Sequence, residues 1–250
     1  MKKQIPNIIT SLNLLCGITA VMFIVSGDLI TASFFAFTGI FFDFFDGLAA
    51  RLLHAQSNIG LQLDSLADMI TSGVVPALVM VQLLSLSVSG AYLDVSQLVT
   101  NEVWNVSLTM YIPFVGLLIA IASAYRLAKF NIDTRQTSGF IGLPTPANTL
   151  FILSLPLILH FQPSETVQTI ILNTWGLIVL TLVSCLLLNA EIRLFALKFS
   201  DWSIAKNLKK YIFIAISIIL LLVFKFISIP FIILFYLLLS VLFKNKKTAG

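Results

Sequence analysis

Four aspartates in one short stretch are the residues of this sequence best suited to chemistry. The stretch DFFDGLAARLLHAQSNIGLQLDSLAD, residues 43–68, contains Asp43, Asp46, Asp64 and Asp68, although the 250-residue chain has only 11 acidic residues. Asp43 and Asp46 are three positions apart, and Asp64 and Asp68 are four apart, so each pair lies on one face of a helix. The residues between them predict a short turn. Two antiparallel helices would then bring the four carboxylates together.

Carboxylates that converge in a poorly hydrated place repel one another, and each ionisable group in a membrane span costs a few kcal/mol. One neighbouring cation, Arg51, cannot balance four negative charges. Hard divalent cations can, because they take oxygen ligands and keep coordination positions free for phosphate. A pair of Mg²⁺ ions about 4 Å apart would clamp a diphosphate and stabilise charge during displacement at phosphorus. The stretch therefore predicts a two-metal site.

Small residues beside the aspartates favour a phosphate ligand. Gly47 and Ala50 follow Asp46 on the first helix and leave a shallow patch where a ligand can lie against the backbone. Gly60 does the same on the opposite helix. Arg51 can bind phosphate oxygens with two parallel hydrogen bonds.

Composition places these residues in a membrane protein. Hydrophobic residues make up 58% of the chain, charged residues 10%, and the mean hydropathy is +1.02. Such values lie outside the range of soluble domains. A spanning helix needs roughly 20 apolar residues, so the chain has room for about six to eight spans. The basic N-terminus followed by an interrupted apolar run predicts a retained first helix, not a cleaved signal.

The fold class predicted is an all-α integral membrane protein with a six-helix core and a C-terminal helical pair, about eight spans in all. The last two spans are separated by a tight turn near Ser228 and Pro230, and they form either a hairpin or a re-entrant pair. A polar segment, 191–210, predicts an interfacial linker. The domain division predicted is therefore a core over 1–190 and a linker with the helical pair over 191–250. The predicted spans are 8–26, 29–50, 65–88, 107–127, 147–161, 169–189, 211–225 and 229–243.

Basic residues predict the orientation in the membrane. With these spans, fourteen of the 15 Lys and Arg residues fall on one side and only Lys225 on the other. Because basic loops stay in the cytoplasm, both termini and the aspartate stretch are expected on the cytoplasmic side of the cell's inner membrane. This bias accounts for the net charge of +4, and the basic residues are expected to face anionic lipid headgroups. The charge therefore indicates no nucleic-acid partner.

The spacing of the stretch resembles a known signature. Asp43-x2-Asp46-Gly47-x2-Ala50-Arg51-x8-Gly60-x3-Asp64-x3-Asp68 matches, without a departure, that of the CDP-alcohol phosphotransferase family. The resemblance covers about residues 1–190. It implies that a hydroxyl attacks the β-phosphorus of a CDP-linked substrate and releases CMP. It also implies a homodimer.

The resemblance assigns roles to individual residues. Asp43, Asp46 and Asp64 resemble the family's ligands for Mg²⁺ or Mn²⁺. Asp68 resembles both a ligand and the general base that takes the proton of the acceptor, so it is the expected catalytic residue. The residues expected to contact the CDP-lipid are Gly47, Ala50, Arg51, Ser57 and Gly60, with Pro6, Asn7 and Thr10 from the IPNIIT segment.

Two further blocks resemble the serine-using branch of the family, the bacterial phosphatidylserine synthases. LQLDSLADMITSGVVPA at 61–77 has Ser65 where phosphatidylglycerophosphate synthases more often have proline, and YRLAKFN at 125–131 precedes GFIGLPTPAN at 139–148. The resemblance implies CDP-diacylglycerol and L-serine as substrates, phosphatidylserine and CMP as products, and membrane lipids as surroundings. The residues expected to contact the acceptor are Arg126, Lys129 and Asn131.

Two alternatives stay open. The same chemistry could use another acceptor, namely glycerol 3-phosphate, inositol phosphate or choline. A protein of another class, a cation-coupled transporter, could also use an aspartate cluster. A transporter would have broken helices at the bilayer midplane and inverted repeats, and the sequence has no clear sign of either.

Overall fold

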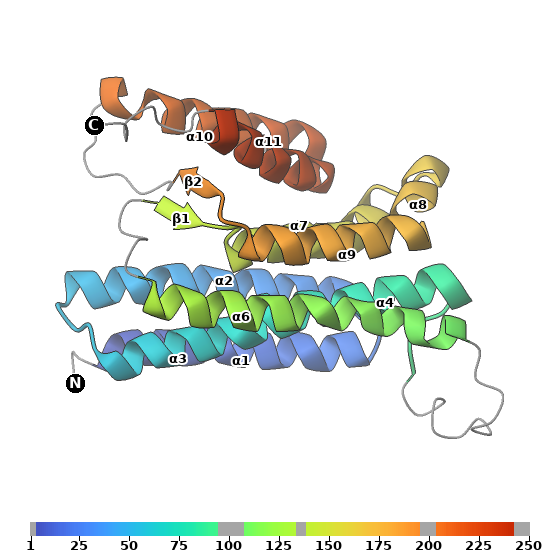
Figure 1. Ribbon diagram of the computed structural model, residues 1–250, viewed down its shortest axis with the longest axis horizontal. Coiled ribbons are helices and arrows are strands. Elements are labelled where there is room, and N and C mark those ends of the chain that lie inside the picture. The colour runs from blue at the N-terminus through green and yellow to red at the C-terminus, as the bar shows by residue number, and fades with distance from the viewer. Residues whose placement is uncertain (1–3, 95–107, 134–138, 196–203, 243–250) are drawn as a thin grey trace.

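Most of the chain folds into long helices that lie along one axis (Figure 1). The computed structural model describes residues 4–94, 108–133, 139–195 and 204–242. The α-helices are α1 (Ile5–Val25), α2 (Leu29–Leu52), α3 (Asn58–Asp68), α4 (Val75–Ser89), α6 (Leu118–Ile132), α7 (Thr145–Phe161), α8 (Glu165–Ile171), α9 (Thr174–Asn189), α10 (Ile204–Phe224) and α11 (Ser228–Leu242). Three further helical segments are the π-helix η2 (Met69–Val74) and the 3₁₀ helices η3 (Leu108–Leu117) and η4 (Lys225–Ile227).

Five helical stretches in the described part of the chain are long and apolar enough to cross a membrane, or six if the pair α8 and α9, bent by 54°, is one span. Helix α7 is apolar but shorter, with 17 residues. The outer surfaces of these helices carry exposed apolar side chains, for example Met22 in α1 and Trp175 in α9, which suit contact with lipid tails. The predicted all-α, multi-pass membrane protein is confirmed.

Polar side chains begin several of these helices. Asp28, Ser57, Ser164 and Asn173 each precede a helix and accept a hydrogen bond from the backbone N–H three residues further on. Such caps satisfy a donor that the first turn leaves without a partner. At Asp28 the hydrogen bonds from Thr31 also hold the pKa of the carboxyl below its usual value.

The connections of the helices gather at two ends of the molecule. The start of α1, the turn between α2 and α3, and the C-terminal end of α6 lie at one end in Figure 1, whereas the turn between α1 and α2 and helix α8 lie at the other. Arg51 and Lys129, in the last turns of α2 and α6, belong to the first of these ends. Several of the basic residues that predict the orientation lie outside the described part of the chain: Lys2, Lys3, Arg135, Lys198, Lys244, Lys246 and Lys247.

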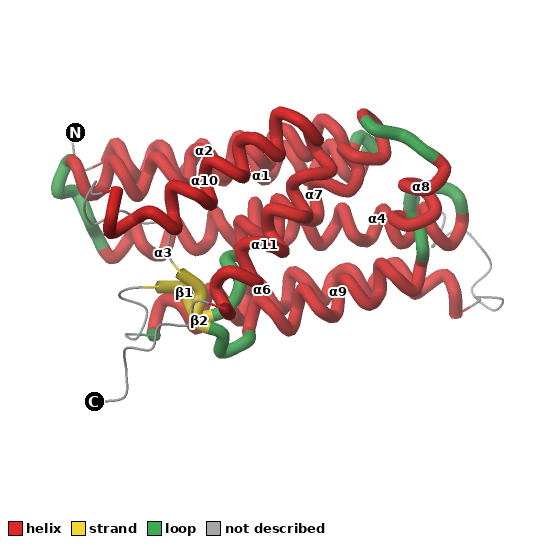
Figure 2. The backbone as a smooth tube through the Cα atoms, turned by 90° about the horizontal axis from the view of Figure 1, so that it is seen from above, coloured by secondary structure: helices red, strands yellow, loops and turns green. Residues whose placement is uncertain are grey.

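Helices α10 and α11 form an antiparallel hairpin that packs on α7 (Figures 1 and 2). The chain reverses at η4, where Lys225 takes φ +51°, three residues before the predicted turn at Ser228. Gln162 at the end of α7 holds this turn through hydrogen bonds to the Phe224 carbonyl and the Ile227 N–H. Of the predicted linker, residues 196–203 lie outside the described part.

A short antiparallel ribbon not expected from the sequence joins the core to this hairpin. Strand β1 (Gly139–Ile141) precedes α7, and strand β2 (Arg193–Phe195) follows α9. Gly142, at φ +76°, turns the chain after β1 so closely to α9 that an added Cβ would lie 2.4 Å from the Leu188 carbonyl oxygen. The ribbon therefore brings the segment after α9 against the start of α7.

The core lies between α1, α2, α4, α7 and α9, and small residues let its helices approach closely. A Cβ on Gly17 would lie 2.5 Å from the Thr71 Oγ1, and a Cβ on Gly39 would lie 2.8 Å from the Thr71 Cγ2. These two glycines bring α1 and α2 against η2. Gly116 brings η3 equally close to α4, because a Cβ there would lie 2.7 Å from the Val81 backbone nitrogen.

Replacing Gly116 with alanine tests this close packing. We expect Gly116→Ala to lower the free energy of unfolding by about 1–3 kcal/mol, because the methyl group meets backbone that cannot move aside. The measurement is thermal unfolding in detergent. The matched control is Gly176→Ala, where the nearest atom would be 3.5 Å away. Equal unfolding temperatures for the two variants would contradict the packing argument.

Candidate active site

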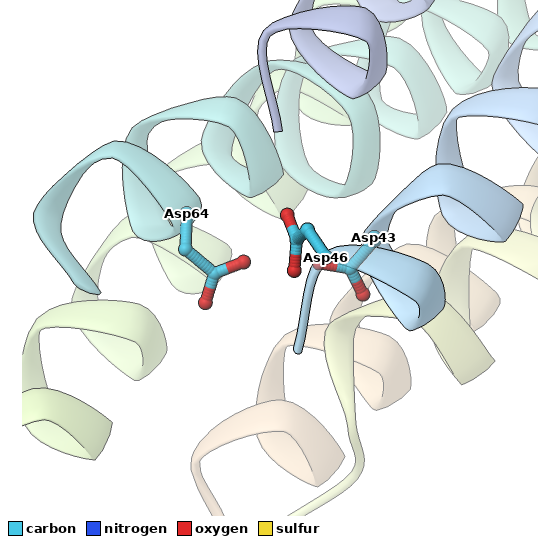
Figure 3. A group of neighbouring side chains, drawn as sticks. All are labelled: Asp43, Asp46 and Asp64. Atoms are coloured by element: carbon cyan, nitrogen blue, oxygen red, sulfur yellow. The ribbon is translucent and has the colours of Figure 1, made fainter. Parts of the chain in front are cut away.

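Three of the four aspartates form a compact group between α2 and α3. Each of Asp43, Asp46 and Asp64 offers one carboxylate oxygen, and these oxygens all lie within 4.8 Å of one another. Figure 3 shows Asp64 pointing from its own helix toward Asp43 and Asp46 on the other. Asp46 is only 6% exposed, and the other two are half-buried. The prediction that the two helices bring their carboxylates together is thus supported by the geometry.

Asp68 lies beside this group and not inside it. It ends α3, one helical turn after Asp64, and is half-buried. Its carboxylate is close enough to Asp43, Asp64 and the Arg126 guanidinium to interact electrostatically with each of them. Asp68 is therefore a neighbour both of the carboxylate group and of a buried cation.

Side chains from α1 cover the carboxylates. The Thr10 hydroxyl donates a 2.6 Å hydrogen bond to the Asp46 Oδ2, and it also lies 3.0 Å from the Pro6 carbonyl oxygen. Asn13, one turn further along the same buried face, interacts with Asp68. Helix α1 thus orients one carboxylate and places an amide beside another.

The residues expected to contact the CDP-lipid fall into two places. Ser57 caps α3 by accepting the Gly60 N–H at 3.0 Å, and a Cβ on Gly60 would lie 3.1 Å from the Asn7 Oδ1. Asn7, Ser57 and Gly60 therefore lie together at the start of α3. Pro6, which precedes Asn7 in the chain, is buried.

The other place is the last turns of α2. A Cβ added to Gly47 would have no atom within 4 Å, so this glycine borders open space. Ala50 is half-buried, and Arg51, in the last turn of α2, is exposed. The two places belong to the helices that carry the carboxylates, but no described contact joins Arg51 to Asn7.

Arg126 is the acceptor candidate that points inward. It is 7% exposed, its Nη1 donates to the Thr145 Oγ1 at 3.3 Å, and its Cζ lies 5.8 Å from the centre of the Phe130 ring. Its Nε has no hydrogen-bonding partner among the described residues. A buried guanidinium with an unused donor next to Asp68 can receive an anionic group.

The other two acceptor candidates are engaged elsewhere. Lys129 forms a 3.2 Å ion pair with Glu191, where both side chains are partly exposed. The Asn131 Nδ2 donates to the Ser65 Oγ at 2.9 Å. This second contact joins the two sequence blocks typical of the serine-using branch, and it ties α6 to α3. Proline at position 65 could not form it.

Sequence reasoning missed several buried polar residues around η2. Ser72 lies on η2, Ser123 faces Gly73 from α6, and Thr145 and Asn148 lie on the buried face of α7. Ser72 Oγ, Ser123 Oγ and Asn148 Nδ2 have no partner among the described residues. Single Ser, Thr and Asn residues are common in apolar helices, so only the packing of α6 and α7 against η2 would have distinguished them.

Comparison with known proteins places this geometry in a family. The sequence profile described as CDP-alcohol phosphatidyltransferase matches residues 3–187. The chain belongs to the CDP-alcohol phosphatidyltransferase family. The enzyme class expected from the aspartate signature is thereby confirmed, and the match covers most of the chain outside the α10–α11 hairpin.

Curated relatives in this family bear related names. The CDP-diacylglycerol–serine O-phosphatidyltransferase of Bacillus subtilis (strain 168) is 38% identical over 147 residues, which are 57% of this chain and 69% of that protein. The protein of the same name from Helicobacter pylori (strain J99) is 29% identical over 224 residues, or 88% of this chain and 81% of its own. The archaetidylserine synthase of Methanothermobacter thermautotrophicus is 28% identical over 152 residues, 60% of this chain and 56% of its own.

The carboxylate group of this family member has the composition of a divalent-cation site. Three oxygens from Asp43, Asp46 and Asp64 converge within 4.8 Å, and Asp46 is nearly sealed from solvent. Oxygen-only ligands suit hard cations such as Mg²⁺ and Mn²⁺. The Thr10 hydroxyl fixes one carboxylate in place, as outer partners of metal ligands do.

Substituting Thr10 tests that role. We expect Thr10→Val to weaken the apparent affinity for Mn²⁺ about 10- to 100-fold, because Asp46 loses the donor that orients it. The measurement is Mn²⁺ binding by electron paramagnetic resonance, together with the Mn²⁺ dependence of CMP release. The control is Thr19→Val, which removes a hydroxyl bound only to the Leu15 carbonyl of the same helix. A raised KM for CDP-diacylglycerol with unchanged Mn²⁺ affinity would instead assign Thr10 to the nucleotide.

Proposed function

We propose that this membrane enzyme transfers the phosphatidyl group of CDP-diacylglycerol to the hydroxyl of L-serine, giving phosphatidylserine and CMP. The observation that carries the proposal is the convergence of three carboxylate oxygens within 4.8 Å, with both Asp68 and the buried Arg126 in their neighbourhood. The carboxylate group suits cations that hold a diphosphate, and Arg126 suits an acceptor with a negative charge. The names of the curated relatives agree with serine as that acceptor.

The reaction that this arrangement suits is a displacement at phosphorus. The serine hydroxyl oxygen forms a bond to the β-phosphorus of CDP-diacylglycerol, the bond from that phosphorus to the CMP oxygen breaks, and Asp68 takes the hydroxyl proton. Mg²⁺ or Mn²⁺ ions held by Asp43, Asp46 and Asp64, with Asp68 at the edge, would supply charge neutralisation for the diphosphate and for CMP. Gly47, Gly60 and Asn7 border the space for the nucleotide part.

The electrostatics around the acceptor favour an amino acid over a phosphate ester. Arg126 is a cation among the electrostatic neighbours of Asp68, and Lys129 forms an ion pair with Glu191. One guanidinium matches one carboxylate, whereas a phosphomonoester carries up to two negative charges and calls for further cations. Ser72 Oγ, Ser123 Oγ and Asn148 Nδ2, which have no partner within the described ranges, offer hydroxyl and amide groups for an ammonium and a carboxylate. Choline has no anionic group and would not use the Arg126 Nε–H.

The placement in the cell is part of the same proposal. Arg51 and Lys129 lie in the last turns of α2 and α6, at the end of the molecule that holds the start of α1, so this end is proposed to face the cytoplasm, where serine is available. The proposed location is the inner membrane, with the acyl chains of the substrate in the bilayer. We also propose a homodimer, and a division into a core over 1–190 and an added segment over 191–250. Family membership leaves the transporter alternative without support.

An acceptor panel tests the proposed function. The purified full chain is given CDP-diacylglycerol, Mg²⁺ or Mn²⁺, and one of L-serine, glycerol 3-phosphate, inositol phosphate or choline, and CMP release is measured. We expect release with serine, little with the others, and none after removal of divalent cations with a chelator. CMP release with another acceptor and none with serine would refute the serine assignment and keep the phosphotransfer.

The role of Asp68 has its own test. We expect Asp68→Asn to lower kcat about 10²- to 10⁴-fold, the range of a lost general base, because the amide cannot take the hydroxyl proton. Asp28→Asn makes the same change at the opposite end of the helices and keeps a capping side chain, so its kcat should equal that of the wild type. Full turnover by the Asp68→Asn enzyme would remove the proposed base.

A further inference from the structure

Helix α6 is hydrogen-bonded to a different neighbour at each of two places. Near its C-terminal end, the Asn131 Nδ2 donates to the Ser65 Oγ of α3 at 2.9 Å. Further back, the Arg126 Nη1 donates to the Thr145 Oγ1 of α7 at 3.3 Å. Both bonds join side chains of separate helices, so α6 is tied to α3 and to α7.

A third bond connects α7 back to the first of these neighbours. Thr149 is fully buried, and its hydroxyl donates to the Ser72 carbonyl oxygen of η2 at 3.1 Å, with the Thr145 carbonyl oxygen of its own helix 2.9 Å away. The π-helix η2 begins at Met69, directly after Asp68 ends α3. The three bonds therefore form a closed circuit through α3, α6, α7 and η2.

The joined elements carry the groups offered to the acceptor. Asp68 ends α3, and the buried Arg126 lies on α6. The atoms with no partner among the described residues belong to the same elements, namely Ser72 Oγ on η2, Ser123 Oγ on α6 and Asn148 Nδ2 on α7. The places of these groups relative to one another thus depend on how the four elements are aligned.

Hydrogen bonds can select that alignment more sharply than apolar packing. Helices α6 and α7 both pack on η2, but the hydrophobic effect has no preferred direction. A hydrogen bond, in contrast, needs a particular distance and angle. A displacement of about 1 Å at a reacting group can lower the rate about 100-fold, so a bond that prevents such a displacement affects the reaction without touching the substrate.

We propose that Ser65, Asn131 and Thr149 are positioning residues for the acceptor: their hydrogen bonds align α3, α6, α7 and η2, and thereby fix where Arg126 receives the acceptor. This role rests on the proposed function, because it assumes that Arg126 binds an anionic acceptor. Asn131 then acts through Ser65, in place of the direct contact with the acceptor expected from the sequence. Thr149 gains a role that no sequence motif suggested.

Substituting Thr149 tests one bond of the circuit. We expect Thr149→Val to raise the KM for serine about three- to tenfold, the effect of losing one hydrogen bond. The KM for CDP-diacylglycerol and the affinity for Mn²⁺ should stay unchanged, because Asp43 and Asp46 are held on α2. The measurement is CMP release by the full chain at varied serine. The control is Thr181→Val, which removes an equally buried hydroxyl that is bonded to the Leu177 carbonyl of its own helix.

A double-mutant cycle tests the bond between Ser65 and Asn131. Ser65→Ala and Asn131→Ala should each raise the serine KM about three- to tenfold, and the double variant no more than either alone, because each change removes the same bond. The control is Ser33→Ala, whose buried hydroxyl is bonded to the Leu29 carbonyl of its own helix; it should keep the wild-type KM. Effects that multiply in the double variant would instead assign Asn131 a separate contact with the acceptor.

Two outcomes separate the circuit from the function on which it rests. If the wild type releases CMP with serine, but Thr149→Val and Ser65→Ala keep the serine KM of their controls, the positioning role is refuted and the proposed function stands. Equal rises of the KM values for serine and CDP-diacylglycerol would also refute it, since they indicate a general loss of structure. A wild-type enzyme that releases no CMP with serine would refute the proposed function itself, and with it this role.

Discussion

The repulsion among closely spaced carboxylates is the constraint on which the rest of the structure depends. Three of their oxygens lie within 4.8 Å of one another in a chain with 10% charged residues. Such a group persists only where the surrounding helices leave it no room to spread and where cations can bind. Gly17 and Gly39 supply the tight packing, because they let α1 and α2 close on η2 directly behind the carboxylates. In this close packing, the Thr10 hydroxyl of α1 donates a hydrogen bond to Asp46 of α2.

A second contact connects this group to the acceptor side. The hydrogen bond between Ser65 and Asn131 ties α3 to α6, and the same helices carry Asp68 and Arg126. Two blocks that are far apart in the sequence thus act as one structural unit. The residues that mark the serine-using branch need not touch the acceptor to matter, since this bond joins the two helices that carry Asp68 and Arg126.

The sequence predicted the helices and the faces of the helices, but not the contacts between helices that are distant in the chain. Spacings of three and four residues place Asp43 with Asp46, and Asp64 with Asp68, because they follow from the period of one helix. The bond from Thr10 to Asp46, the ion pair of Lys129 with Glu191 and the bond from Arg126 to Thr145 depend on how separate elements pack. No periodicity encodes that packing. The π-helical turn after Asp68 and the β1–β2 ribbon were missed for the same reason.

On the proposed function, acceptor choice depends on the number of free cations near Asp68. A core with both Arg126 and Lys129 available would suit a phosphate ester, which carries up to two charges. Here Lys129 forms a surface ion pair with Glu191, while Arg126 is buried and bonded to Thr145. Glu191 lies after residue 187, where the family profile ends. The shared core would then supply the phosphotransfer chemistry, and the added C-terminal segment would narrow the acceptor to a molecule with one carboxylate.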